Sequence, residues 1–340
     1  MKKLFRGSIF AMLVTAVLGI SGCFIEPSYR EASGDQSGNQ TPIRVLTIGT
    51  ADTGGTMYPV GCAIAEAINS YNNQVNINLG ASTGSFENVR GLSSGQFDLG
   101  LVTGDVAYAA YNGTKDFEGH AEDGLRAIGA LYTSSSNWMV PEESGLVYVH
   151  DLAGKQIAVG PEGSTTEYSA RIALAAAGLT PANTTPVNCG IGYGSEEVKK
   201  GTMDAVHGFA GIPVRGLSSL AEAIPCRLLI YTPEELEEIL DDNPIYRKEV
   251  IPAGTYRGQT EDVDSFGIQC LLCVSESMDD SMAYSIAKIL DQAIPELTKD
   301  HPMLHSMKDP GYLCNQLPIP LHPGAERYYK EKGRGCRFYD

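Results

Sequence analysis

One kind of junction recurs three times along the chain. A short apolar run ends in a turn rich in Gly, Ser and Thr, and a stretch with helical periodicity follows. The three turns occupy residues 49–59 (GTADTGGTMYP), 81–88 (ASTGSFEN) and 160–167 (GPEGSTTE). Apolar runs that alternate with helical stretches are typical of parallel strands joined by helices. The pattern therefore predicts an α/β fold of the doubly wound class.

The alternation occurs in two series. The first has expected strands at 44–50, 75–81, 97–103 and 125–132. The second begins near Trp138 and has expected strands at 156–160, 185–189, 205–209 and 227–231. A strong apolar strand at 265–274 and a helix through residue 297 then follow. We expect two lobes, the first of them discontinuous: residues 43–137 with 265–340 form lobe 1, and residues 138–264 form lobe 2.

The position of the three turns predicts a binding site. A helix N-terminus leaves backbone N–H groups unpaired and carries a partial positive charge. Ligands of open α/β sheets bind beyond the carboxyl ends of the strands, which is where these turns lie. If the turns converge, they form a pocket for a small organic anion, and no Arg is required.

The first turn nearly matches the phosphate-binding loop G-x-x-x-x-G-K-[ST], but Gly55 stands where that loop has its Lys. The Lys neutralises the β- and γ-phosphates, so its absence disfavours a nucleoside triphosphatase. Gly54, Gly55 and the hydroxyl of Thr56 keep a geometry that suits a carboxylate. The alternative is a tight turn that binds nothing.

The other two turns repeat this chemistry. In the second turn, Gly84 lets a ligand approach the backbone, and Ser85 or Asn88 can donate hydrogen bonds. In the third turn, Ser164 and Glu167 match a capping box. Helix capping alone is therefore the alternative to ligand binding at the third turn.

Four further residues are candidates for the site. Thr103 ends the expected strand at 97–103 and is a weaker fourth helix start. Arg215 follows the strand at 205–209 and can pair with a carboxylate, the alternative being an ordinary exposed Arg. Tyr58 and Trp138 can cover the apolar part of a ligand, with core packing as an equal alternative.

Catalytic and metal-binding motifs are missing from the sequence. There is no G-x-S-x-G elbow, and Ser285 and Lys288 match S-x-x-K only inside an expected helix, without the accompanying motifs. His301 and His305 have the spacing of two zinc ligands on one helix, but Pro302 lies between them. We therefore expect no catalytic residue, no metal and no cofactor.

Seven cysteines follow Cys23, so at least one has no partner within the chain. Cys270 and Cys273 lie on an expected strand, where residues three apart point to opposite faces. We therefore expect them to be small buried residues, not a redox or metal pair. Two disulfide pairings stay open: Cys189 with Cys226, and Cys314 with Cys336.

The first 42 residues predict export. A basic start precedes an apolar stretch at 8–20, which is shorter than the roughly 20 residues of a spanning helix. The segment ISGC (20–23) resembles the lipobox of bacterial lipoproteins, in which the Cys is lipidated; the alternative is an ordinary signal peptide with a chance Cys. We expect a signal peptide at 1–22, a lipid on Cys23 and a flexible tether at 23–42. The body would be periplasmic or otherwise extracytoplasmic, anchored to a membrane.

The chain is acidic, with a formal net charge of -16. This charge disfavours DNA, RNA and anionic lipid as direct partners. An anionic ligand must then be attracted by local helix dipoles, against the field of the whole chain.

These motifs, in this order, resemble the TAXI family of solute receptors, the extracytoplasmic binding proteins of one branch of TRAP transporters. The resemblance rests on GTADTGGTMYPVG (49–61), STGSFENVRGLSSGQFDLGLVTGDVAYAAYNG (82–113), DLAGKQIAVGPEGSTTE (151–167) and IPLHPGAERYYKEKG (319–333). It implies a type II periplasmic-binding fold, a two-lobed clamshell with the ligand cleft between the lobes. Known ligands of the family are amino-acid or dicarboxylate anions such as glutamate and 2-oxoglutarate.

The resemblance also implies a set of ligand contacts. By motif they are Gly54, Gly55, Thr56, Tyr58, Thr83, Gly84, Ser85, Asn88, Ser164, Thr165 and Thr166. Cys62, Thr103 and Thr165 depart from residues that are frequent in the family. The implied protein is a monomeric receptor, not an enzyme, that delivers a small anion to the small and large TRAP permease subunits, which are often fused. The alternatives are a lipoprotein sensor that presents the anion to a membrane signalling protein, and an exported enzyme on the same fold.

Overall fold

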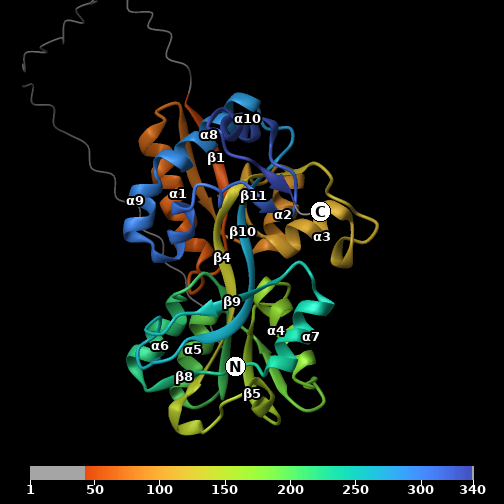
Figure 1. Cartoon of the computed structure of the whole chain (residues 1–340), viewed down its shortest axis with the longest axis vertical. Coiled ribbons are helices and arrows are strands. Elements are labelled where there is room, and N and C mark those ends of the chain that lie inside the picture. Colours follow the sequence, from red (N-terminus) through yellow and green to blue (C-terminus); the bar gives the residue numbers. More distant parts are fainter. Residues whose placement is uncertain (1–42, 339–340) are drawn as a thin grey trace, which may run out of the picture. The chain divides into compact units, whose positions relative to one another are not determined.

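The computed structural model describes residues 43–338. The predicted signal peptide, the lipidated Cys23 and the tether lie outside the described residues. None of the helices in 43–338 combines the length and the apolar character that a membrane span requires. Within this part of the chain two lobes are seen, one above the other in Figure 1.

Lobe 1 is built on three parallel strands, each followed by a helix. The strands are β1 (Arg44–Gly49), β2 (Val75–Gly80) and β3 (Leu99–Thr103), and the helices are α1 (Met57–Tyr71), α2 (Ser85–Ser94) and α3 (Gly104–Asn112). The strand order is β2-β1-β3, and β10 (Val263–Ser275) runs antiparallel beside β3. The order reverses at β1 because successive helices cover opposite faces of the sheet.

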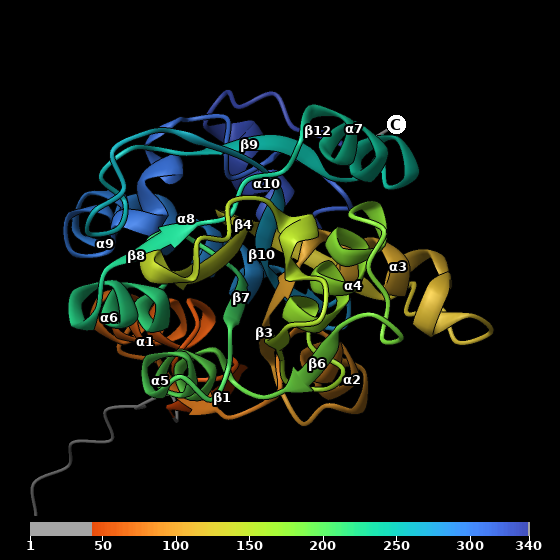
Figure 2. The same ribbon diagram turned by 90° about the horizontal axis from the view of Figure 1, so that it is seen from below.

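Lobe 2 repeats this plan. Its parallel strands are β5 (Gln156–Gly160), β6 (Thr185–Asn188) and β7 (Ala205–Ala210), and the helices that follow them are α4 (Thr165–Ala176), α5 (Ile191–Lys200) and α6 (Arg215–Ala223). The strand order is β6-β5-β7, and β4 (Leu125–Pro141) runs antiparallel beside β7. Viewed from below, α5 and α6 lie on one side of the strands and α4 lies on the other (Figure 2). The expected α/β, two-lobed, type II architecture is confirmed.

Two long strands pass through both lobes. β4 and β10 pair antiparallel from Leu125 opposite Ser275 to Ser135 opposite Gly267. The sequence predicted a strand at 125–132 and a fresh start near Trp138, and this was wrong, because one strand continues to Pro141. The four polar side chains at 134–137, three Ser and one Asn, are buried in the middle of this strand. The expected boundary between residues 137 and 138 therefore falls inside β4.

The remaining elements complete the two lobes. Lobe 1 receives α8 (Asp280–Gln292), α9 (Ile294–Asp300), α10 (Pro323–Glu331) and the parallel pair β11 (Asn315–Leu317) and β12 (Arg337–Phe338). Lobe 2 receives α7 (Pro233–Asp242), β8 (Cys226–Leu228) beside β4, and β9 (Arg247–Ile251) beside β10. Short 3-10 turns are η1 (Lys115–Phe117), η2 (Glu142–Ser144), η3 (Val149–Leu152) and η4 (Pro302–Lys308).

The sequence pattern of a capping box occurs at Ser164, Thr232 and Ser277 and predicts a helix start at each, and the structure agrees at the first two. Thr232 accepts a hydrogen bond from the Glu235 N–H at 3.2 Å, and the Glu235 carboxylate accepts one from the Thr232 N–H at 2.8 Å. Ser164 accepts from the Glu167 N–H at 3.2 Å. The capping box expected at Ser277 was wrong, because α8 begins later, with Asp279 as its N-cap. Asp is as good an N-cap as Ser, so the two starts compete.

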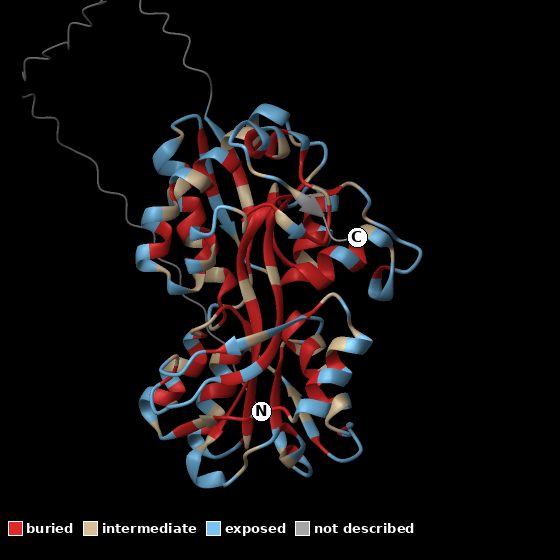
Figure 3. Ribbon diagram, viewed as in Figure 1, coloured by how far each residue is buried: buried red, intermediate tan, exposed pale blue. Residues whose placement is uncertain are grey.

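The buried side chains follow the strands and the inner faces of the helices (Figure 3). One apolar core fills lobe 1 and two lie on the two faces of the lobe 2 sheet. Cys270 and Cys273 are fully buried, as expected for small apolar residues. Burial raises the pKa of the Cys270 thiol to about 12, so this thiol is neutral at physiological pH.

Candidate functional site

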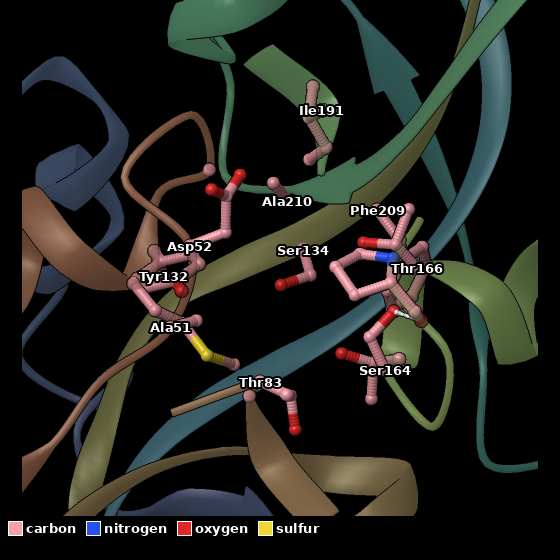
Figure 4. A pocket seen from close by; sticks show the side chains of 15 residues that line it. Ala51, Asp52, Thr83, Tyr132, Ser134, Ser164, Thr166, Ile191, Phe209 and Ala210 are labelled. Carbon is pink, nitrogen blue, oxygen red and sulfur yellow. Dashed lines mark hydrogen bonds between the residues drawn. The ribbon is translucent and has the colours of Figure 1, made fainter. Parts of the chain in front are cut away.

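A cavity lies between the lobes, where the carboxyl ends of their parallel strands face each other (Figure 4). It is lined by Ala51, Asp52, Gly55, Met57, Thr83, Gly84, Tyr132, Ser134, Pro161, Ser164, Thr165, Thr166, Ile191, Phe209 and Ala210. Its volume is about 40 Å³, which is enough for ordered water, since a cavity needs roughly 10–15 Å³ to admit one.

All three predicted turns contribute to this lining. The first turn provides Gly55, the second provides Thr83 and Gly84, and the third provides Ser164, Thr165 and Thr166. Each turn follows a parallel strand, and the two halves of the ten-stranded sheet point the carboxyl ends of these strands toward the same space. The convergence that the turn pattern required is therefore present.

Helix N-termini from both lobes border the cavity. Met57 is the first residue of α1, Gly84 is the N-cap of α2, Thr165 opens α4 and Ile191 opens α5. The first N–H groups of a helix have no intrahelical partner and carry partial positive charge. The cavity can therefore stabilise a carboxylate although no Lys, Arg or His is among its lining residues.

Ser134 is a site residue that the sequence did not single out. It lies in the middle of β4 and is 1% exposed; its hydroxyl lies near the Tyr132 phenol, whose pKa it lowers, but forms no hydrogen bond of normal length and angle among the described residues. In Figure 4 this hydroxyl points into the space between the two lobes. A buried hydroxyl without a partner costs about 1–3 kcal/mol. A solute with a hydrogen-bonding group in this cavity would remove that cost.

Tyr132 also lines the cavity from β4 and was not predicted. Burial raises the pKa of its phenol well above the usual value of 10, so the group stays neutral at physiological pH. The polar run at 134–137 inside an apolar strand was the only sequence signal for this part of the site. Polar groups that are buried in a strand usually need a partner, and here a ligand can be the partner of Ser134.

Asp52 brings the one carboxylate of the cavity lining. Its Oδ2 accepts a hydrogen bond from the Gly54 N–H at 3.2 Å. The carboxylate lies against the start of α5 in the other lobe, because a Cβ added to Gly190 would be 3.1 Å from the Asp52 Cγ. Asp52 was not among the predicted site residues.

Thr56 has a different role from the one expected, since it is buried and is not part of the lining. Its hydroxyl donates a 2.7 Å hydrogen bond to the carbonyl of Gly211 in lobe 2. Gly54 is also engaged across the lobes: its carbonyl accepts from the Gly216 N–H at 3.1 Å. Tyr58 is half-buried and does not line the cavity.

Ser85, Asn88 and Thr103 do not line the cavity either, and their side chains are bonded within lobe 1. The hydroxyls of Ser85 and Thr103 lie 3.2 Å apart and share a hydrogen bond. Asn88 donates to the carbonyls of Thr50 and Leu101 at 2.8 and 2.7 Å. The Asn88 side chain therefore connects α2 to Thr50, just after β1, and to Leu101 in β3. It holds the turns in position and does not face the cavity.

Trp138 and Arg215 do not approach the cavity. Trp138 is 1% exposed in the lobe 2 core, and its indole N–H donates to the Tyr231 hydroxyl at 2.9 Å. The structure therefore places Trp138 in the core, in line with the core-packing alternative. Arg215 is exposed at the start of α6 and is absent from the cavity lining.

A buried hydrogen-bond chain supports the third turn. His207 Nδ1 lies 3.2 Å from the carbonyl of Thr166, and Nε2 lies 2.9 Å from the Ser136 hydroxyl. The Ser136 hydroxyl also lies 2.7 Å from the Tyr231 hydroxyl. A carbonyl only accepts, so Nδ1 carries the proton and Nε2 accepts from Ser136. Burial lowers the pKa of His207 to about 3, which keeps this tautomer neutral.

Other hydrogen bonds also join the lobes. The Tyr246 hydroxyl donates to the Asp105 carboxylate at 2.7 Å in a buried position. Lys115 Nζ donates to the Tyr168 hydroxyl at 2.5 Å near the surface. Together with the Thr56 and Gly54 contacts, these bonds hold the two lobes closed around the cavity.

The arrangement is suited to holding a small polar molecule. It combines helix N-termini, hydroxyls and one carboxylate, and within 43–338 no cluster of three or more His, Cys, Asp or Glu side chains could hold a metal ion. The Ser164 hydroxyl donates its proton to the carbonyl of Pro161 at 2.6 Å.

The sequence profile of the NMT1-like family matches residues 48–333. Among solved structures, the chain is similar to the periplasmic aliphatic sulphonate binding protein of Escherichia coli, with 14% identity, a TM-score of 0.47 and coverage of 84% of this chain and 78% of that one. It is similar to the alkanesulfonate-binding protein of Xanthomonas axonopodis pv. citri bound to MOPS, with 18% identity, a TM-score of 0.48 and coverage of 85% and 84%. It is also similar to an ABC transporter periplasmic binding protein from Brucella ovis with glutathione bound, with 16% identity, a TM-score of 0.45 and coverage of 77% and 76%.

Proposed function

The chain belongs to the NMT1-like family, and from this premise and the geometry of the cleft we propose that it is a solute receptor. The observation that carries the proposal is a buried hydroxyl, that of Ser134, without a partner in a cavity bordered by helix N-termini of both lobes. A solute that bonds to both lobes stabilises the closed arrangement and not an open one. Such differential binding is what couples a ligand to a hinge.

The proposed solute is a small molecule with a carboxylate, such as glutamate, a dicarboxylate or a 2-oxo acid. The N–H groups at the start of α4 and the Ser134 hydroxyl would hold the carboxylate. Gly55, Thr83, Gly84, Ser164, Thr165 and Thr166 are the predicted contacts that line the cavity. Gly54, Thr56, Tyr58, Ser85, Asn88 and Thr103 would act on the solute only through the loops that they position.

The resemblance to the TAXI family supports a finer proposal. The receptor would deliver its solute to a TRAP-type permease with a small and a large subunit, which are often fused. It would act as a monomer outside the cytoplasm, tethered through residues 23–42 to a lipid on Cys23. The closed form, in which residues of both lobes present one continuous surface, would be the form that the permease recognises.

An exported enzyme and a lipoprotein sensor are the other functions considered. An enzyme needs a titratable group positioned at the reacting atoms. Asp52 is the one carboxylate in the cavity lining, so an enzyme on this fold would have to use it. The sensor differs from the receptor only in its membrane partner. A gene for a TRAP permease beside the gene of this chain would favour the receptor.

A binding screen tests the proposal. The full-length chain, purified in detergent, is melted with glutamate, glutamine, 2-oxoglutarate, succinate and neutral sugars, and each positive result is measured by calorimetry. A solute at 100 times its Kd adds about 2.7 kcal/mol of stability, which raises Tm by about 4 °C for a chain of this length. Turnover of any solute, or binding of sugars alone, would contradict the proposal.

A further inference from the structure

The charge around the cavity does not match a purely anionic solute. Asp52 is the only Asp or Glu side chain among the lining residues, and no lining residue is basic. Asp52 is half-buried. Its carboxylate lies against Gly190, the N-cap of α5 in lobe 2. A carboxylate placed in a small closed cavity repels a second negative charge strongly, since little water is left to screen it.

The outer part of the cleft does not compensate for this negative charge. A second cavity shares Thr83 and Ser164 with the first and opens between α2 and α4. Its charged lining residues are Arg90 and Arg171 against Glu87, Asp116, Glu162 and Glu167. A dicarboxylate would therefore place its second charge either near Asp52 or in a rim with more carboxylates than guanidiniums.

The two ends of the inner cavity differ in charge. Figure 4 shows Asp52 on one side and Ser164 with Thr166 on the other, and Ser134 lies between them. The side of Ser164 and Thr166 is the N-terminal end of α4, which favours negative charge. On the side of Asp52, the full negative charge of the carboxylate exceeds the partial positive charge of the α5 start beside it, so this side favours positive charge. A molecule with an ammonium group close to a carboxylate matches this polarity.

We infer that Asp52 is a specificity-determining residue that binds an ammonium group of the solute, so that the preferred solute is an α-amino acid and not the matching 2-oxo acid. The inference rests on the proposed function, because it assumes that this cavity holds the solute. The ammonium group donates to the Asp52 carboxylate, and the carboxylate of the solute accepts from the start of α4 and from Ser134. An ion pair in a closed cavity is strong when both of its members are hydrogen-bonded.

Matched solute pairs test the inference. Calorimetry on the full-length chain compares glutamate with 2-oxoglutarate and alanine with pyruvate, since each pair differs only in the amino and oxo groups. We expect the amino acid of at least one pair to bind about tenfold or more tightly than its partner. In Asp52→Asn, which keeps the shape of the side chain, that preference should disappear.

A ratio of affinities separates specificity from closure. If Asp52 served only the contact with α5, Asp52→Asn would weaken both members of a pair by the same factor and leave their ratio unchanged, which would overturn the inference. Asp98→Asn is the control, because Asp98 accepts from the Thr47 N–H at 2.9 Å in lobe 1 and is not part of the cavity lining. Asp52→Ser gives a second, smaller uncharged variant if Asp52→Asn does not fold.

Two failures can be told apart. If the unmodified chain binds 2-oxoglutarate or pyruvate as tightly as the amino acid or more tightly, the inference is wrong and the receptor function stands. If it binds none of the four solutes and no succinate, the proposed function fails and the inference falls with it.

Discussion

The hydroxyl of Thr56 in lobe 1 donates a 2.7 Å hydrogen bond to the carbonyl of Gly211 in lobe 2. Both residues are buried, and Gly211 lies just beyond the end of β7. A residue expected to touch the solute thus connects the lobes that enclose it. Substitutions that remove this contact, or others across the cleft, should therefore change how readily the two lobes close.

Replacing Thr56 by Val should weaken solute binding without a direct contact being lost. The change leaves the buried Gly211 carbonyl without its donor in the closed form, at a cost of about 1–3 kcal/mol. We expect an affinity loss of about tenfold, measured by calorimetry with the solute that the screen identifies. Thr56→Ser keeps the hydroxyl and should bind nearly as tightly as the unmodified chain; equal binding by Thr56→Val would contradict the role of this bond.

Gly54 and Gly55 are neighbours with opposite tolerance for a side chain. A Cβ on Gly54 would lie 2.5 Å from the Gly192 nitrogen across the cleft, whereas a Cβ on Gly55 would meet its nearest atom, the Asp52 carbonyl oxygen, at 3.6 Å. Gly54→Ala should therefore keep the lobes apart. Small-angle scattering with saturating solute should give a larger radius of gyration for Gly54→Ala than for the unmodified chain. Gly55→Ala is the control for closure, and a compact Gly54→Ala would refute the prediction.

Ser134 and Ser136 lie two positions apart on β4, and both are buried. Within residues 43–338 the Ser134 hydroxyl forms no hydrogen bond of normal geometry, while the Ser136 hydroxyl is bonded to His207 and Tyr231. Ser134→Ala should leave the free energy of unfolding of the solute-free chain unchanged or raise it by about 1 kcal/mol, and should reduce solute affinity about tenfold. Ser136→Ala should instead lower the free energy of unfolding by about 1–3 kcal/mol. Urea unfolding and calorimetry distinguish the two, and a strongly destabilised Ser134→Ala would be inconsistent with this account.

His207 should make the stability of lobe 2 depend on pH. Burial lowers its pKa to about 3 in the folded chain, whereas an unfolded His has a pKa of about 6.5. Between these values the unfolded chain binds the extra proton, so the free energy of unfolding falls with falling pH by up to about 1.4 kcal/mol per pH unit. The stabilisation by the neutral ring is complete above pH ~6.5 and is lost as pH falls toward ~3.

The slope assigned to His207 can be measured with a matched pair of variants. In urea unfolding between pH ~4 and ~7, His207→Gln should lack this slope. His120→Gln changes an exposed His and should keep the slope. If both variants show the pH dependence of the unmodified chain, another group is responsible.

Much of the fold could be predicted because strands and helices have short periods. The apolar alternation at 75–80 and the helical spacing after Thr56 depend on residues only a few positions apart, and the structure has β2 and α1 there. The Thr232 capping box was recognisable for the same reason. The site was partly predictable, since each turn has to follow its strand, and Gly55, Thr83 and Thr165 do line the cavity.

The remainder depended on contacts between distant residues. The 125–141 segment looked like two pieces because four polar residues interrupt it, yet pairing with β10 on one side and β7 on the other keeps it in one strand. Asn88, Ser85 and Thr103 looked like ligand donors because their chemistry suits a ligand, but partners in neighbouring segments take up their hydrogen bonds. The sequence shows which side chains can donate a hydrogen bond, but the acceptor that each one meets depends on how distant segments pack.

The sequence by itself determined that this chain folds into α/β lobes and that three uncharged turns precede helices. Only the tertiary structure decided which atoms of those turns face the cavity. In the folded chain the Thr56 hydroxyl is bonded to the Gly211 carbonyl, and the Asp52 carboxylate lies beside the start of α5. The Ser134 hydroxyl has no hydrogen bond of normal geometry among the described residues. The physical reason is that secondary structure follows from neighbours along the chain, while a site between two lobes is formed by groups that meet only after both have folded.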